Sequence, residues 1–187
     1  IMYLSMSGCG VGFSVESKTA QQFPIIKRQK GTEITKHLVG DSKEGWAEAF
    51  VTAISTWYKG EDIELDYSKV RKKGARLKTM GGRASGPQPL MDLMDFTKAR
   101  VLSKQGRRLT NLDLHDIICK IGEIVIAGGV RRSAMISLSD LDDSALREAK
   151  HGPFWTVNPQ RSMANNSAVY EEKPDVKTFL EEWMGLV

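Results

Sequence analysis

A turn rich in glycine and arginine, residues 127–134, constrains the fold of this chain more than any other stretch. It reads Ala-Gly-Gly-Val-Arg-Arg-Ser-Ala and lies between a long apolar pattern of helical period and a short apolar strand pattern. Adjacent glycines allow backbone conformations closed to other residues, and two planar guanidinium groups can grip anions such as phosphate. The stretch predicts either a ligand-binding loop or an ordinary helix end followed by solvated arginines.

The composition is that of an ordinary globular protein. Of the 187 residues, 41% are hydrophobic and 27% are charged, which suits one domain with a sizeable core. No apolar run approaches the roughly 20 residues of a membrane span, and the N-terminus lacks the basic segment of a signal peptide, so we expect a cytoplasmic protein without membrane contact. Two cysteines and three scattered histidines predict neither a disulfide framework nor a metal site.

The ends of the chain interrupt regular patterns. The first residues lie within an apolar run, and the last lie within an unfinished helical pattern. Natural domains usually begin and end in polar residues, so we expect a piece of a larger protein. The net charge of +4 suits an anionic ligand.

Apolar residues at helical spacing predict three long helices. The first begins at Asp41 or Ser42 and ends before Gly60, the second begins near Pro87 or Pro89, and the third begins at residues 109–113 and leads into the turn. Shorter patterns predict strands at 63–67 and 134–138, a short helix at 142–150, and a loop or edge hairpin at 17–41. We expect Cys119 to be a buried structural thiol and His115 to lie on the surface.

Two further glycine-rich stretches are candidate ligand sites. Gly8, Gly10 and Gly12 could let a ligand approach an extended backbone, or they could form a tightly packed turn. A basic run over residues 69–83 leads into a second glycine turn at 81–87, where freed amides and cations could hold a polyphosphate. A solvated charged face is the alternative, and nucleic-acid binding is opposed by the lack of interleaved aromatic residues.

Paired amides at Asn165 and Asn166 precede a strand pattern. They could hydrogen-bond a sugar or base, or they could satisfy a turn.

Taken in order, these stretches resemble the adenosylcobalamin-dependent (class II) ribonucleotide reductases, and most closely their monomeric ribonucleoside-triphosphate reductase branch. The resemblance rests on residues 6–15, 44–46, 81–90, 108–110, 129–134 and 164–169. It implies an α/β fold, part of a ten-stranded barrel with helices packed outside. Residues 17–60 resemble an insertion that mimics a dimer interface, and residues 61–139 resemble the effector and specificity loops with their connecting helices.

The resemblance also implies site residues. The substrate-pocket positions are Gly8, Cys9, Gly10, Arg132 and Asn166. The positions around a deoxynucleoside triphosphate effector are Asp66, Ser68, Arg71, Leu77, Gly82, Ser85, Gly129 and Arg131. Arg132 would reach toward the substrate from the specificity loop.

The family's Asn-Pro-Cys-x-Glu radical motif and its reducing cysteine pairs are not in the 187 residues. We therefore expect no catalytic residue and no activity from this chain alone. Adenosylcobalamin would be bound mainly by other segments of the enzyme, and a thioredoxin-like protein would reduce the complete reductase. The alternative interpretation is a non-catalytic nucleotide-binding regulatory module.

Overall fold

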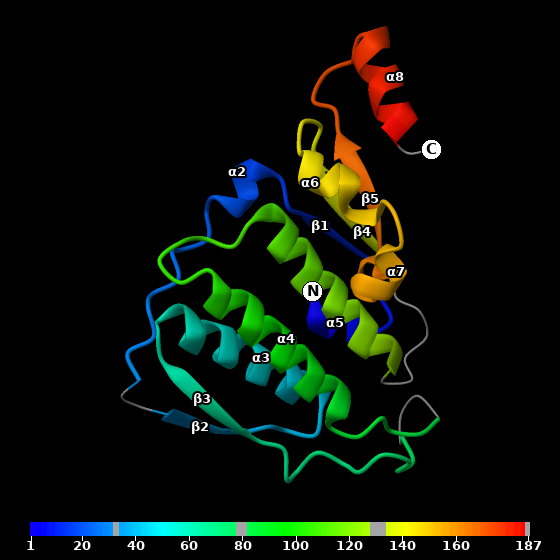
Figure 1. Cartoon of the computed structure of the whole chain (residues 1–187). Helices are drawn as coiled ribbons and strands as arrows, with labels where there is room; N and C mark the ends of the chain where they lie inside the picture. The colour runs from blue at the N-terminus through cyan, green and yellow to red at the C-terminus, as the bar shows by residue number, and fades with distance from the viewer. Residues whose placement is uncertain (32–33, 78–81, 128–133, 186–187) are drawn as a thin grey trace.

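Two separate parallel sheets lie on either side of a layer of long helices in the computed structural model of the chain (Figure 1). The structure describes residues 1–31, 34–77, 82–127 and 134–185. One sheet has the strand order β1-β4-β5, with β1 at Val11–Ser14, β4 at Met135–Asp140 and β5 at Ala164–Val169. The other pairs β2 (Ile34–Leu38) with β3 (Asp62–Asp66). The predicted α/β class is confirmed, and a ten-stranded barrel is not formed by these strands.

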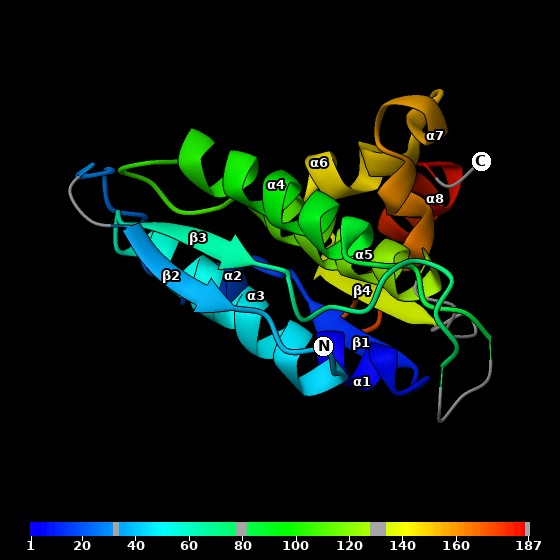
Figure 2. The same ribbon diagram turned by 90° about the horizontal axis from the view of Figure 1, so that it is seen from below.

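The helical layer consists of α3 (Lys43–Tyr58), α4 (Gln88–Ser103) and α5 (Asn111–Ala127). All three predictions of helices are confirmed. Ser42 caps α3 by accepting a hydrogen bond from the Gly45 N–H at 3.0 Å, and Pro87 precedes the first turn of α4. Figures 1 and 2 show α4 between α3 and α5, with β2 and β3 beyond α3.

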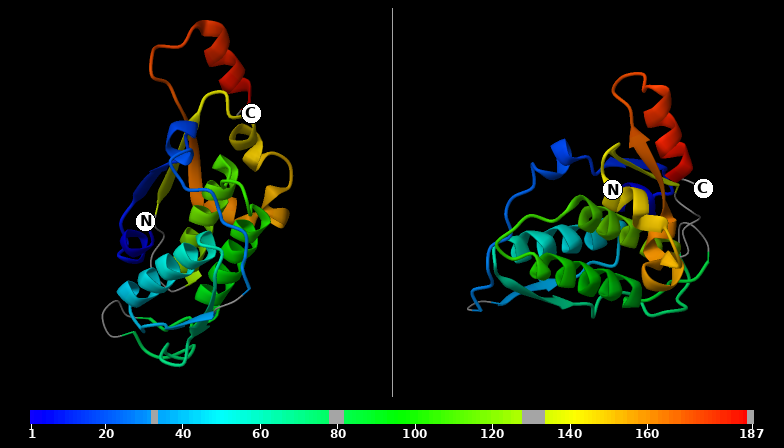
Figure 3. Two further views of the ribbon diagram at one scale, coloured as in Figure 1. Left: turned by 90° about the vertical axis from the view of Figure 1, so that its left-hand side faces the viewer. Right: turned by 45° about the horizontal axis from the view of Figure 1, so that its top comes forward.

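Shorter elements complete the chain. They are α1 (Met2–Met6), α2 (Ser17–Ala20), α6 (Ser144–Arg147), α7 (Phe154–Val157), α8 (Val176–Gly185) and the 3-10 helices η1 (Glu148–Lys150) and η2 (Pro159–Met163). Helix α8 projects from the fold (Figure 3) but contacts it at its C-terminal end, where Glu182 pairs with Arg147 and the Gly185 carbonyl oxygen lies 2.9 Å from His151 Nε2. None of its described residues is buried.

One face of the β1-β4-β5 sheet packs on α5. Alternate residues of β1 and β4 are buried there, including Phe13 and Met135, as the side-chain period of a strand requires. A Cβ on Gly122 of α5 would lie 2.7 Å from the Met135 sulfur. The glycine therefore lets helix and sheet approach closely.

The predicted loop at 17–41 is found at residues 21–31, but the stretch also contains α2 and β2, and the alternative of an edge hairpin is wrong. Strand β2 runs parallel to β3, with Ile34 opposite Asp62, and parallel neighbours need a crossover rather than a hairpin turn. Helix α3 supplies that crossover, so the pair is a βαβ unit. Strand β2 was not predicted, because its side chains are mostly exposed and its sequence is correspondingly polar.

In the described part of the chain, none of the helices is both long enough and apolar enough to cross a membrane.

Candidate functional site

Of the predicted effector residues, Asp66 ends β3, and Ser68 and Arg71 lie in the turn that follows it. The Asp66 carboxylate accepts a hydrogen bond from the Ser68 N–H at 2.8 Å. Hydrogen bonds from the Ser68 backbone and hydroxyl hold the pKa of Asp66 below its ordinary value. The turn is exposed, so a ligand in solution can reach it.

Arg71 is bound to Asp41 through three hydrogen bonds. Its Nε donates to Asp41 Oδ2 at 2.8 Å, its Nη2 donates to the Asp41 carbonyl oxygen at 3.4 Å, and its backbone N–H donates to Oδ1 at 3.2 Å. The two side chains keep 34% and 32% of their surface exposed. The guanidinium is thus oriented by protein but still open to solvent.

Residues 74–77 pair with residues 82–84 as in a hairpin, and residues 78–81 between them lie outside the described residues. Gly74 and Ala75 pair with Ala84, and the Leu77 N–H donates to the Gly82 carbonyl oxygen at 3.1 Å. Gly82 has a φ of +87°, a conformation that favours glycine. The loop carries Arg76 and Arg83 on its exposed surface.

The nearby Ser85 hydroxyl donates to the Gly86 carbonyl oxygen at 3.2 Å. Leu77 and Gly82 are hydrogen-bonded to each other, and Ser85 lies three residues after Gly82.

The loop before α4 and the C-terminal end of α5, which precedes the predicted specificity loop in sequence, lie at the same end of the helical layer. Residues 82–87 lead into the start of α4, and α5 ends at Ala127 before residues 128–133. Helices α4 and α5 are neighbours that run in opposite directions, so the start of one lies beside the end of the other (Figures 1 and 2). Gly129, Arg131 and Arg132 themselves lie outside the described residues.

The predicted substrate glycines lie beside Ala134, the first described residue after residues 128–133. The Val11 N–H donates to the Ala134 carbonyl oxygen at 2.9 Å, and a Cβ on Gly10 would lie 3.7 Å from that oxygen. Gly8 has a φ of +80°, and Cys9 is exposed. Residues 8–10 therefore adjoin the described residue that follows the specificity loop.

Asn166 lies on the helix-facing side of β5. Its side-chain oxygen is 3.0 Å from His115 Nε2, and its neighbour Asn165 is exposed on the opposite face. The structure thus pairs Asn166 with α5.

His115 is completely buried, so the prediction of a surface residue is wrong. It stacks obliquely on Phe13, with ring centroids 6.2 Å apart, and Cys119 packs one turn along α5 with its sulfur 3.7 Å from Nε2. Cys119 was predicted to be buried and is, and its spacing of four residues from His115 is the signal that could have placed the histidine on the same inner face.

A buried ionic cluster surrounds His115, and the sequence reading missed it. Asp116, fully buried, accepts hydrogen bonds from Arg161 Nε at 2.7 Å and Nη2 at 3.0 Å, and it forms an ion pair with Arg100 at 3.1 Å. Burial opposes ionisation of Asp116, but the hydrogen bonds from His115 and Arg161 outweigh it and lower the pKa to about 2. The cluster joins α4, α5 and η2 through buried charges, and separating these charges would cost free energy of folding.

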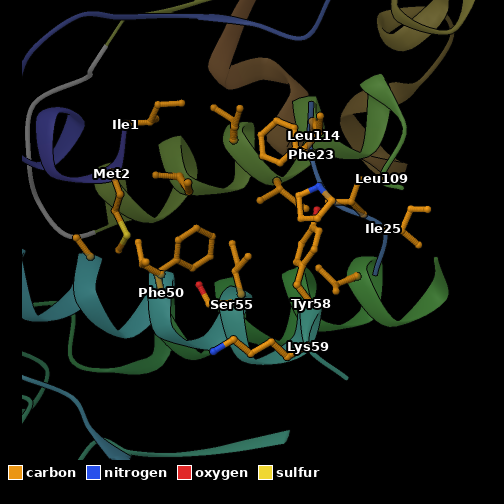
Figure 4. Close-up of a pocket in the computed structure, with 18 of the residues that line it drawn as sticks. Ile1, Met2, Phe23, Ile25, Phe50, Ser55, Tyr58, Lys59, Leu109 and Leu114 are labelled. Atoms are coloured by element: carbon orange, nitrogen blue, oxygen red, sulfur yellow. The ribbon is translucent and has the colours of Figure 1, made fainter. Parts of the chain in front are cut away.

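An apolar groove of about 720 Å³ opens between α1, α3, α5 and residues 23–27 (Figure 4). Phe23, Phe50 and Leu114 line it, and Tyr58 contributes a ring whose pKa is raised to about 12 because it is half-buried. The groove does not fit adenosylcobalamin, whose corrin ring carries amides that need hydrogen-bond partners, because its walls are almost wholly apolar. The described residues also contain no cluster of histidine, cysteine or carboxylate side chains able to hold a metal ion.

Comparison with known proteins identifies related enzymes. Residues 14–102 match the family model described as B12-dependent ribonucleotide reductase, insertion domain. The chain is 31% identical over 174 residues to the adenosylcobalamin-dependent ribonucleoside-triphosphate reductase of Euglena gracilis, covering 91% of this chain and 23% of the relative. It is 38% identical over 199 residues to the enzyme of that name from Lactobacillus delbrueckii subsp. bulgaricus, covering 88% of this chain and 27% of the relative.

A solved structure agrees with the sequence comparison. The crystal structure of a B12-dependent (class II) ribonucleotide reductase superposes with a TM-score of 0.77 at 27% identity, covering 89% of this chain and 28% of that one. The chain therefore spans about a quarter of the length of the relatives it matches.

Proposed function

Since this chain is a segment of a class II ribonucleotide reductase, we propose that it binds the deoxynucleoside triphosphate effector and forms one wall of the ribonucleotide pocket. The complete enzyme would reduce ribonucleoside triphosphates in the cytoplasm with adenosylcobalamin and a thioredoxin-like reductant. Cofactor chemistry, which generates the radical, would belong to the other segments of the reductase. The role of this chain would be to recognise the effector and the substrate.

One observation supports the proposal: the glycine-rich basic stretch at 82–86 that leads into α4, and the C-terminal end of α5, which the second such stretch follows in sequence, lie at the same end of the α4–α5 pair. Backbone amides freed by glycine and nearby guanidinium groups together suit a triphosphate. The Asp66–Ser68 turn and Arg71 lie just upstream of the first loop. An effector held there would lie close to both loops.

The substrate wall is proposed from the other side of the second loop. Gly10 adjoins Ala134. A change in the conformation of residues 128–133 would therefore move the backbone beside residues 8–10. In this proposal Arg132 carries the message from effector to substrate. Arg132→Ala in the complete reductase should then disturb which substrate each effector selects, measured as relative turnover of the four ribonucleotides.

Asn166 remains a proposed substrate-pocket residue. It would act there without touching the substrate, because its side-chain amide already contacts His115. The division into an insertion at 17–60 and effector loops at 61–139 also remains part of the proposal.

Equilibrium binding tests the proposal on the 187-residue chain itself. We expect dATP, dGTP, dCTP or dTTP to bind, and Arg83→Ala to weaken binding roughly tenfold through loss of one phosphate contact. Lys177→Ala removes the same charge from α8, which lies at the opposite end of the molecule from the start of α4 (Figure 1), and should leave affinity unchanged. Failure of all four nucleotides to bind would refute the proposal.

A second measurement separates the reductase from a regulatory module that binds nucleotides without chemistry. In the reductase, activity should appear when the missing segments are supplied, whereas a regulatory module would bind effector and never turn over. Oligonucleotide binding that falls steeply with salt would instead indicate a nucleic-acid partner.

A further inference from the structure

We infer that Asp41 is a positioning residue for the effector, because it holds the Arg71 guanidinium by one edge and leaves the other edge facing an anion. The inference rests on the proposed function, in which Arg71 binds effector phosphate. Asp41 itself would not touch the ligand.

The hydrogen bonds define which edge is used. Within the described residues, the guanidinium donates through Nε and Nη2 to Asp41. A guanidinium has five N–H groups in a fixed plane, and a phosphate takes two parallel bonds from neighbouring nitrogens. The edge formed by Nη1 and the second Nη2 proton is left for that purpose, on a side chain that is 34% exposed.

Asp41 is itself held in place, as an orienting group must be. The Val39 N–H donates to the Asp66 carbonyl oxygen at 2.9 Å, which ties the preceding chain to the end of β3. Ser42 caps α3, and a Cβ on Gly45 would lie 2.7 Å from the Gly40 Cα. The backbone on both sides of Asp41 is therefore packed or hydrogen-bonded.

This arrangement singles out Arg71 among its basic neighbours. Lys69, Lys72, Lys73 and Arg76 are exposed, and Arg71 is the only described cation of residues 69–83 for which the structure gives an ion pair. A side chain already fixed loses less conformational freedom when a ligand binds. The neighbouring cations supply attraction, while Arg71 supplies direction.

Asp41 could instead oppose binding, because a carboxylate repels phosphate. Both charges of the pair are about one-third exposed, so water and salt screen that repulsion. The orientation of the fork is a matter of geometry and is not screened. We therefore expect the favourable effect to dominate.

The test measures binding of dTTP and of inorganic tripolyphosphate to the 187-residue chain and its variants. Asp41→Ala should weaken both probes by roughly three- to tenfold, and Asp41→Asn, which keeps one acceptor oxygen, should weaken them less. In an Arg71→Lys background, which keeps the charge and lacks the fork, removal of Asp41 should have no further effect. Circular dichroism checks that each variant is folded.

Asp62→Asn is the matched control. Asp62 forms a similar part-exposed ion pair with Lys98 at 2.7 Å, at the opposite end of β3 from Arg71. Its neutralisation changes net charge equally and should leave both affinities as they are.

The outcomes distinguish this inference from the proposed function. If the parent chain binds neither probe, the proposed function fails and the inference fails with it. If the parent binds and Asp41→Ala binds equally or more tightly, only the positioning role is refuted. An equal loss on removing Asp41 in the Arg71→Lys background would also refute it, because the effect would then not pass through the fork.

Discussion

Neutralising Asp116 should destabilise the chain strongly and in a pH-dependent way. The carboxylate is fully buried and holds two arginines, of which Arg161 has only 11% of its side chain exposed. Asp116→Asn keeps the shape but leaves both guanidinium groups without their counter-charge. Removing one partner from a buried pair typically costs about 3–5 kcal/mol.

The pKa gives an independent estimate of part of this cost. The pKa of Asp116 is lowered from 3.8 to about 2, and such a difference contributes on the order of 2 kcal/mol to the free energy of unfolding. Because the pKa is lower in the folded state, this stabilisation is complete above about pH 4 and is lost as the pH falls through about 2. Asparagine cannot titrate, so the stability of the variant lacks this contribution to the pH dependence.

Urea unfolding followed by circular dichroism measures both effects. We expect Asp116→Asn to lose at least about 2 kcal/mol at pH 7, with a deficit that shrinks as the pH falls from 4 toward 2. Asp142→Asn is the control, because Asp142 is exposed, and it should change stability by no more than about 0.5 kcal/mol. A deficit below that figure, or one that is the same at pH 7 and pH 2.5, would refute the account of the cluster.

Local geometry leads to three further predictions. Ser42→Ala removes the cap that accepts from the Gly45 N–H and should cost about 1 kcal/mol in urea unfolding; no change would mean that the cap is not used. Gly60→Ala should cost at least about 2 kcal/mol in the same assay, because φ is +76° and a Cβ would lie 2.2 Å from a backbone oxygen; a neutral result would contradict this conformation. Burial raises the pKa of Cys119 to about 12, so a thiol reagent at pH 8 should modify the exposed Cys9 in the native chain and reach Cys119 only after denaturation; fast native labelling of Cys119 would show that the core is open.

The sequence predicted the long helices well because their apolar spacing reflects the burial that stabilises them. Trp46, Phe50 and Trp57 recur at helical intervals and are all buried on α3. A buried apolar face leaves this trace whatever lies opposite it. The same holds for Cys119, whose place in the apolar pattern was enough to predict its burial.

Polar features were harder to predict because their positions depend on partners distant in sequence. His115 was predicted to lie on the surface, but the packing of η2 and β5 on α5 brings Asn166 against it and Arg161 against its neighbour Asp116. Arg71 was predicted as a site residue, while Asp41, which orients it, was seen only as a helix start. Local propensity carries no information about such pairings.

The βαβ unit formed by β2, α3 and β3 has a consequence for the order in which the chain folds. Ile34 pairs with Asp62 through a short crossover, whereas Val11 pairs with Met135 only after almost the whole helical layer has been traversed. Closing the longer loop costs more chain entropy, and pairings between distant residues form slowly. The βαβ unit can therefore assemble first and offer α3 as a template for α4 and α5. Strand β1, which follows Gly8 and Gly10 in the chain, would then join last, once the turn that holds Arg71 already exists.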